Sequence, residues 1–328
     1  MKLLIKETVE VKEYVENVAL TKSIKNIRPS LKTATTKYLF RYIPRDFYKD
    51  FSKKYDDGDL NEFEEELLPY LQETIVLYAF AISTAKRQVI ETDSGIHIIS
   101  TANQKTAFEH QIKALKDTYL EDANYALEEL LEFLTENADK TELLKWRKSD
   151  YFTETNECFI KNSKECNKIA SSLNIEARHF IEMKSDLMKV QEKQIKATLT
   201  PSLYEELLKQ YKGSNVNERN KKLLQPIKEA ILYLGYVKYT DLQQLKNTTD
   251  GTTIPKKTTN SLSSREQATG EVLSAFSFRL YEEGNAALGE LKTFLDDNYR
   301  DYPLYENSKN FGQPKVIQND KNNSYYVP

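Results

Sequence analysis

The strongest constraint on the fold of this chain is that part of its sequence occurs twice. The stretch Asn124–Asn137 returns as Asn285–Asn298, with eight identical positions at an offset of 161. A second set of matches has an offset of 156, and one five-residue insertion between Gly251 and Leu280 reconciles the two offsets. Amphipathic helices of similar composition give some coincident apolar positions, but they do not give a shared order of elements at near-constant spacing. We therefore predict two similar helical units from an internal duplication.

The matches at the offset of 156 join residues that keep helical spacing in both halves. They are Ile27 with Met183, Leu31 with Leu187, Leu39 with Ile195, Ile43 with Leu199, Phe47 with Leu203, Tyr48 with Tyr204, Leu67 with Leu223, Leu68 with Leu224, Glu73 with Glu229, Ile75 with Ile231 and Gly95 with Gly251. The shared order is helix, helix, helix, glycine turn and helix.

The repeat also sets the domain organisation that we expect. The segments are an N-terminal segment (1–22), a first helical unit (23–145), a connecting helix (146–175), a second helical unit (176–298) with a long polar loop (246–264), and an extended C-terminal arm (299–328). Nine glycines and nine prolines are few for this length, which favours long helices over a turn-rich β fold. The predicted fold class is therefore mainly α, with a few short strands.

Charge and hydropathy exclude several classes of protein. The formal net charge of −3 gives no bulk attraction to nucleic acid or to an anionic membrane. No apolar run approaches the ~20 residues that span a bilayer, and the first residues lack the apolar region of a signal peptide. Cys158 and Cys166 would lie about 12 Å apart along a helix, too far for a disulfide. These features favour a reduced, intracellular site of folding.

Local signals place the helices and turns of the first unit. Pro44 ends one helix and opens the next, which should run from Arg45 to Tyr55. Asp59 followed by Glu62 is typical of a capping box for a long helix that Pro69 kinks or begins. Beyond a turn at Gly95 we expect a short strand over 96–100, and then two helices over 104–119 and 122–136.

The sequence offers no catalytic constellation, so we expect a protein that is not an enzyme and needs no cofactor. His97, His110 and His179 have no metal-ligand spacing to one another or to a cysteine. No phosphate-binding glycine loop, nucleophile elbow or zinc-protease motif is present. The acidic runs near Glu64 and Glu129 are typical of solvated helix faces rather than of a paired acid and base.

The candidate functional residues are therefore residues that bind partner proteins. Lys246, Lys256 and Lys257 lie in the long polar loop, where they would face an acidic partner surface or the channel of an assembly. Trp146 lies at the junction of the units, where it packs them together or contacts a partner. Tyr325 and Tyr326 are aromatic anchors in the arm, whose upstream residues, Tyr302 to Tyr305, pack on their own unit or join the arm.

Four short motifs of the chain can be compared with those of known families. They are a Ser-Gly-Ile turn at 94–96, the helix Ala126-Leu127-Glu128-Glu129-Leu130-Leu131-Glu132-Phe133-Leu134, the run Trp146-Arg147-Lys148-Ser149, and Tyr302-Pro303-Leu304-Tyr305. Together they resemble an uncharacterised structural protein family of Bacteroidetes phages and prophages. The resemblance covers most of residues 25–305. It implies a virion structural protein that is similar to a head-to-tail ring (connector) protein of crAss-like phages.

The resemblance implies partners and a location as well. We expect a homo-oligomeric ring, of about twelve copies beneath a portal or about six chains that present the repeated units. The ring would contact the portal and neighbouring neck or tail proteins, and DNA would pass through its channel without specific binding, with no membrane partner. The alternatives are another virion assembly or tail-completion factor, and a cytoplasmic helical nucleic-acid-handling or enzymatic protein.

Overall fold

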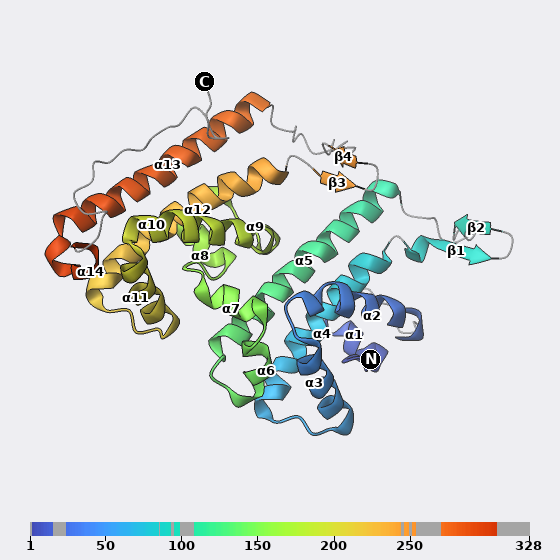
Figure 1. Cartoon of the computed structure of the whole chain (residues 1–328). Coiled ribbons are helices and arrows are strands. Elements are labelled where there is room, and N and C mark those ends of the chain that lie inside the picture. The colour runs from blue at the N-terminus through green and yellow to red at the C-terminus, as the bar shows by residue number, and fades with distance from the viewer. Residues whose placement is uncertain are drawn as a thin grey trace. The chain divides into compact units, whose positions relative to one another are not determined.

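The chain folds into two compact units, Met1–Glu154 (unit 1) and Thr155–Pro328 (unit 2). A computed structural model describes residues 2–15, 24–84, 86–92, 95–98, 108–243, 246–248, 251–253 and 270–306. The described residues are mainly helical, which confirms the predicted fold class (Figure 1).

Unit 1 is built around one helix, α4 (Glu62–Ser83), whose C-terminal half is buried on all sides. The elements are α1 (Thr8–Lys12), α2 (Arg28–Lys37), α3 (Arg45–Asp57), α4 (Glu62–Ser83), β1 (Val89–Thr92), β2 (Gly95–Ile98), α5 (Glu109–Glu136), α6 (Leu144–Arg147) and α7 (Asp150–Glu157), with 3₁₀ turns at Ile24–Asn26, Leu39–Arg41, Lys86–Gln88 and Thr141–Leu143. Every residue of α4 from Thr74 to Ala81 is buried. Helices α2 and α5 both pack on α4, and α5 lies alongside it (Figure 1).

Unit 2 is organised around α12 in the same manner. The elements are α8 (Ser163–Ile169), α9 (Ala177–Val190), a π-helical turn (Gln191–Ile195), α10 (Lys196–Leu199), α11 (Pro201–Lys212), α12 (Glu218–Gln243), β3 (Lys246–Thr248), β4 (Gly251–Thr253), α13 (Gly270–Asp297) and α14 (Pro303–Glu306), with 3₁₀ turns at Ser171–Leu173 and Tyr299–Asp301. Helices α9 and α13 pack on α12. A two-stranded antiparallel hairpin, β3–β4, follows α12, just as β1–β2 follows α4.

The helix starts of the two units agree at the offset of 156. Helices α3 and α11 begin at Arg45 and Pro201, and α4 and α12 begin at Glu62 and Glu218. The residue before α4, Asn61, accepts a hydrogen bond from the backbone N–H three residues later at 2.9 Å. Its counterpart Asn217 accepts the equivalent bond at 2.7 Å. Such side-chain caps satisfy a backbone donor that the first helical turn leaves unpaired.

The long helices α5 and α13 agree at the offset of 161. Each has 28 residues and ends in an asparagine whose side-chain amide donates to the carbonyl four residues earlier. These bonds join Asn137 to Phe133 at 2.9 Å and Asn298 to Phe294 at 2.8 Å. The two units therefore share the starts of two aligned helices, the length of the long helix that follows and the asparagine caps, while the prediction that they superpose stays a prediction.

Proline does not end either central helix. Pro69 lies inside α4 between the buried residues Leu67 and Leu71, and Pro226 lies inside α12. A proline in a helix interior costs ~3 kcal/mol because it removes one hydrogen bond and crowds the preceding turn. Burial of Leu67 and Leu71 on the two sides of Pro69 offsets this cost. The helix start predicted at Pro69 is therefore wrong, because α4 begins at Glu62, while the predicted kink stays a prediction.

The single connecting helix predicted over 146–175 is wrong. The segment contains α6, α7 and α8, and Cys158–Ile160 between α7 and α8 is not helical although all three side chains are fully buried. Asn162 starts α8 by accepting a hydrogen bond from the backbone N–H of Glu165 at 2.9 Å. This cap requires extended backbone before the helix, so a continuous helix cannot form there.

Candidate interaction surfaces

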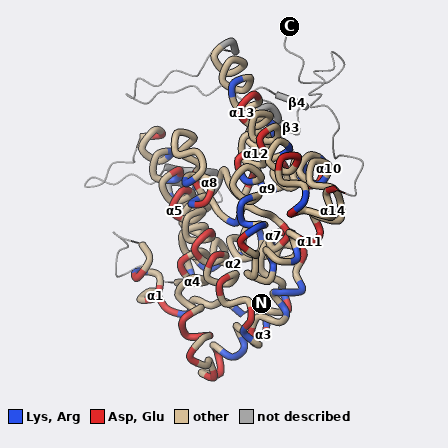
Figure 2. Tube along the Cα trace, turned by 90° about the vertical axis from the view of Figure 1, so that its left-hand side faces the viewer, with Lys and Arg blue, Asp and Glu red and all other residues tan. Residues whose placement is uncertain are grey.

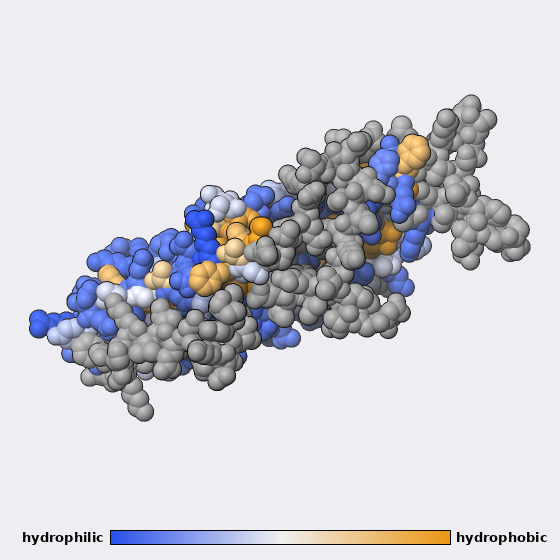
Figure 3. Space-filling model, turned by 90° about the horizontal axis from the view of Figure 1, so that it is seen from above, coloured by the Kyte–Doolittle hydropathy of each residue, from blue (hydrophilic) through white to orange (hydrophobic). Residues whose placement is uncertain are grey.

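The N-terminal halves of α5 and α13 expose apolar side chains. In unit 1, Phe108 and Leu115 are 69% and 48% exposed. In unit 2, Val272, Phe276 and Phe278 are 59%, 42% and 50% exposed. We call these two groups the outer apolar surfaces. Figure 3 shows that apolar areas interrupt a largely hydrophilic surface in the view from above.

Burial along α5 and α13 explains why these surfaces lie at one end of each helix. The buried residues of α5 begin at Ala123 and continue to Leu134. In α13 the residues Ala287, Leu291 and Leu295 are buried, whereas most residues before Leu280 are exposed. Each helix therefore uses its C-terminal half for its own core and exposes large apolar side chains along its N-terminal half, as surfaces that contact other molecules do.

Trp146 is not part of an exposed surface, so the prediction that it anchors a partner is wrong. Its side chain in α6 is fully buried, and its ring lies 4.8 Å from that of Phe152, measured between centroids. The chain turns between α6 and α7 and brings Phe152 back over the indole. The aromatic residues of this segment are thus core residues of unit 1.

Among the other predicted partner-binding residues, the structure locates the backbone of Lys246. It lies in β3 and pairs with Thr253 of β4, so the segment predicted as a loop begins with a hairpin. Lys256, Lys257, Tyr325 and Tyr326 lie outside the described residues.

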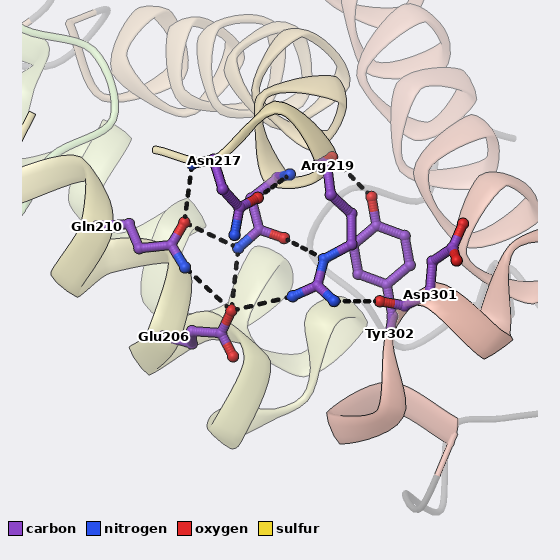
Figure 4. A network of polar contacts seen from close by, with 7 residues as sticks. Glu206, Gln210, Asn217, Arg219, Asp301 and Tyr302 are labelled. Carbon is purple, nitrogen blue, oxygen red and sulfur yellow. Dashed lines mark hydrogen bonds and ion pairs between the residues drawn. The ribbon is translucent and has the colours of Figure 1, made fainter. Parts of the chain in front are cut away.

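The C-terminal arm predicted from residue 299 does not begin there. Tyr302 and Tyr305 are fully buried in the core of unit 2. The hydroxyl group of Tyr302 donates to the backbone carbonyl of Arg219 at 2.8 Å, and the Arg219 guanidinium lies 5.2 Å from the Tyr302 ring centroid (Figure 4). Burial raises the pKa of Tyr302 to about 12. Residues 299–306 are therefore an integral part of unit 2.

A polar network behind Tyr302 holds the start of α12 against α11 (Figure 4). Asn220 is fully buried, and its side-chain amide donates to Glu206 at 3.2 Å and to Gln210 at 3.0 Å. Glu206 also pairs with Arg219 at 3.3 Å. Because the buried amide nitrogen is satisfied, this network stabilises the fold. The sequence analysis did not predict this network. One indication of it was that Asn217 aligns with Asn61 at the offset of 156, and both residues precede a long helix.

Each unit also contains a cluster of lysine, tyrosine and glutamate. In unit 1 the Lys6 ammonium lies 4.1 Å from the Tyr55 ring centroid, and the Tyr55 hydroxyl donates to Glu10. Glu10 also accepts a hydrogen bond from the backbone N–H of Lys6 at 2.6 Å. This cluster fastens α1 and the buried residues before it to α3.

The corresponding cluster in unit 2 has one more positive charge. Lys161 lies 4.8 Å from the Tyr211 ring centroid, and its backbone N–H donates to Glu165 at 2.8 Å. Lys228 forms an ion pair with Glu165 and lies 5.3 Å from the same ring. The clusters align because Lys161 and Glu165 follow Lys6 and Glu10 by 155 residues, and Tyr211 follows Tyr55 by 156.

Burial changes the protonation of this second cluster. It lowers the pKa of Lys161 to about 8, against the opposing effects of Cys158 and Glu165. The Lys161 ammonium donates to the carbonyls of Thr155 and Asn156 at 3.3 Å each. Burial raises the pKa of Cys158, so its thiol stays protonated and is a poor nucleophile. The cluster thus joins α7, α8 and α11 rather than forming a reactive thiolate site.

Two searches of the described residues gave negative findings. No group of three or more His, Cys, Asp or Glu side chains in this part of the chain could hold a metal ion. No helix in the same residues has both the length and the apolar composition to cross a membrane.

The fold and surfaces define a mainly helical protein of two similarly ordered units, each with an exposed apolar end on its longest outer helix. The sequence profile of a family of unknown function (DUF6712) matches residues 12–156 and 195–315. These stretches make up most of the chain, so the protein belongs to this family. Comparisons with curated proteins and with solved structures find no match.

Proposed function

We propose that this protein is a phage virion structural protein, a head-to-tail connector that forms a ring in the neck between portal and tail. The observation that carries the proposal is the pair of outer apolar surfaces. A helix end that exposes several large apolar side chains is typical of a protein contact site. The placement in a virion depends on the resemblance of the helix motif in α5 and of Trp146–Ser149 to the phage family.

We also propose that the two units arose by duplication, which suits a ring protein because one chain then presents two similar sets of contacts. The support comes from buried positions at constant offsets. Leu31 and Leu187 are both fully buried, as are Leu130 and Leu291. Leu115 and Phe276, one from each outer apolar surface, are also separated by 161 residues.

In this proposal the outer apolar surfaces contact the portal or a neighbouring neck or tail protein. A ring of roughly twelve copies would match the portal, and about six chains would present the same number of units. DNA would pass through the channel without specific binding, because a chain with a net charge of −3 releases few counterions on contact. The working location is the virion neck, and the protein has no enzymatic role.

Binding of the protein to a portal, and its incorporation into particles, test the proposal. We expect L115E and V272E/F276E to lose portal binding and incorporation, because a carboxylate opposes burial of the surface. The matched control is V9E, which places the same group on a residue that is 63% exposed in α1. All variants should keep the circular dichroism spectrum of the wild type. Normal incorporation of both surface variants, or a wild type that is absent from purified particles, would refute the proposal.

A further inference from the structure

Corresponding ends of the two units carry opposite charge. In unit 1 the turn from α3 into α4 exposes five acidic side chains, which we call the acidic end: Asp57, Asp59, Glu62, Glu65 and Glu66. In unit 2 the turn from α11 into α12 exposes four lysines, which we call the basic end: Lys209, Lys212, Lys221 and Lys222. Figure 2 shows the acidic residues where α3 leads into α4.

The inversion occurs at positions that the repeat aligns. At the offset of 156, Glu65 corresponds to Lys221 and Glu66 corresponds to Lys222. Asp56 likewise corresponds to Lys212. Both α4 and α12 begin at the aligned residue, so Glu65 and Lys221 are each the fourth residue of their helix, and Glu66 and Lys222 are each the fifth.

Helix electrostatics explains only part of the basic end, because Lys209 and Lys212 lie in the last turn of α11, where lysines are favourable, whereas Lys221 and Lys222 lie at the start of α12. The N-terminus of a helix carries a partial positive charge, so acidic residues there are stabilising and lysines are not. Glu62 and Glu65 in the first turn of α4 follow this rule, whereas Lys221 in the first turn of α12 opposes it. A lysine that the helix dipole does not favour is consistent with a role in contacting an acidic partner.

Most of these charges are not neutralised within the chain. In the part of the chain that the structure describes, Asp57, Asp59, Glu65 and Glu66 form no ion pair, and neither do Lys209 and Lys222. Lys221 pairs with Glu218 one turn away, and Lys212 pairs with Glu157 at 2.7 Å. Both ends therefore keep a surplus of charge for an external contact.

The same difference in charge is found over the whole of each unit. Residues 1–154 contain 22 Lys and Arg and 28 Asp and Glu, whereas residues 155–328 contain 25 and 22. Unit 1 is thus acidic and unit 2 is basic. Two identical chains attract each other when unit 1 of one approaches unit 2 of the other, and they repel when like units meet.

We infer that copies of this chain associate head to tail, with the acidic end of one copy against the basic end of the next. Such a contact joins two different surfaces, and when each copy uses its two ends for two different neighbours it produces a closed ring or an open filament. Like charges oppose the pairing of equal ends. The inference rests on the proposed function only in naming a ring as the assembled product. Self-association itself is measured on the isolated protein.

Charge-reversal variants test this contact by sedimentation velocity of the full chain. E65K/E66K gives unit 1 the residues of unit 2, and K221E/K222E gives unit 2 those of unit 1. We expect each variant alone to associate at least about tenfold more weakly than wild type, which corresponds to about 1.4 kcal/mol. An equimolar mixture should recover association, because one variant then has two basic ends and the other has two acidic ends.

The controls separate this contact from net charge and from folding. D150K/E154K makes the same change in net charge on exposed residues of α7 and should associate as wild type does. All variants should keep the thermal midpoint of the wild type within a few degrees. Association should also weaken from 0.1 M to 1 M salt, as the screening length falls from about 10 Å to about 3 Å.

Three results would overturn the inference: a wild type that stays monomeric at low salt, reversal variants that associate normally, or a mixture that does not recover. These results leave the proposed function standing if the protein still binds portals through its outer apolar surfaces. Conversely, a chain that associates head to tail but never enters particles would refute the proposed function alone.

Discussion

Replacement of Gly235 by alanine tests how closely two helices of unit 2 approach. Gly235 lies in α12 where α9 crosses it, and a Cβ atom there would lie 2.5 Å from Cδ2 of Leu187. It would also lie 3.2 Å from the Cα and 3.3 Å from the backbone nitrogen of the same residue. Leu187 is fully buried, so its side chain cannot move into solvent, and the backbone contacts require α9 itself to shift.

Two opposing effects set the size of the change. Overpacking of this kind costs about 1–3 kcal/mol. Alanine in a helix interior is more stable than glycine by about 1 kcal/mol, so we expect G235A to lose about 1 kcal/mol net. G289A is the matched control, because it has the same gain in α13 and no atom lies within 4 Å of its new Cβ. The variants should differ by about 1–3 kcal/mol, which is the packing cost alone.

Hydrogen exchange read on peptides of α9 and α12 measures the free energy of opening within unit 2. Urea unfolding followed by circular dichroism gives the global value for comparison. If G235A is as stable as G289A, the two helices are not in the contact described and the reasoning is wrong.

Three further predictions concern single side chains. L130A and L291A should each cost about 2–5 kcal/mol in urea unfolding, and a much larger loss for one would contradict their equivalence. The pKa of Lys161 is about 8, below its ordinary value of 10.5, so the unfolded chain binds more protons between these pH values. The contribution of Lys161 to stability should therefore rise from pH 8 to 10.5, and the difference in unfolding free energy between wild type and K161M at each pH should show this rise. Y302F should cost about 1–3 kcal/mol, because it leaves the Arg219 carbonyl without its donor, and faster exchange in residues 299–306 should accompany the loss.

Much of the helical fold could be predicted because local signals and periodicity agree. Pro44 before α3 and Gly58 after it bound that helix, and Gly58 adopts the left-handed backbone with φ of 71°. The repeat also identified positions, such as Leu31 and Leu187, that are buried in both units. These signals depend on residues close in sequence or on the comparison of two halves, so they needed no knowledge of tertiary packing.

The predicted helix boundaries were wrong where a local sequence pattern fitted more than one structure. The spacing of Phe152, Phe159 and Cys166 also fits a helix face, but the Asn162 cap separates the last two. The capping box of α4 uses Asn61 and Glu64 rather than Asp59 and Glu62. The helices predicted over 104–119 and 122–136 are a single helix over the described part, α5, because no residue between them breaks it.

The candidate interaction surfaces were harder to predict than the core. The motif around Trp146 and the tyrosines near residue 302 drew attention because aromatic residues often bind partners, yet here they are buried. Phe108, Leu115 and Phe276 follow the same periodicity as core residues, and only the structure shows that their side chains are largely exposed. The opposite charges could be found by aligning the two halves of the sequence. Only the structure shows that the aligned residues lie at the same positions near the starts of α4 and α12.

The burial of Trp146 gives the molecule a built-in optical reporter. It is the single tryptophan of the chain, and it lies wholly within unit 1 beside Phe152. Its emission should shift to longer wavelength when unit 1 opens, whereas unit 2 contains no tryptophan and contributes to the signal only through tyrosine and phenylalanine. Fluorescence and circular dichroism recorded on one sample would therefore reveal whether the two halves melt together or in succession.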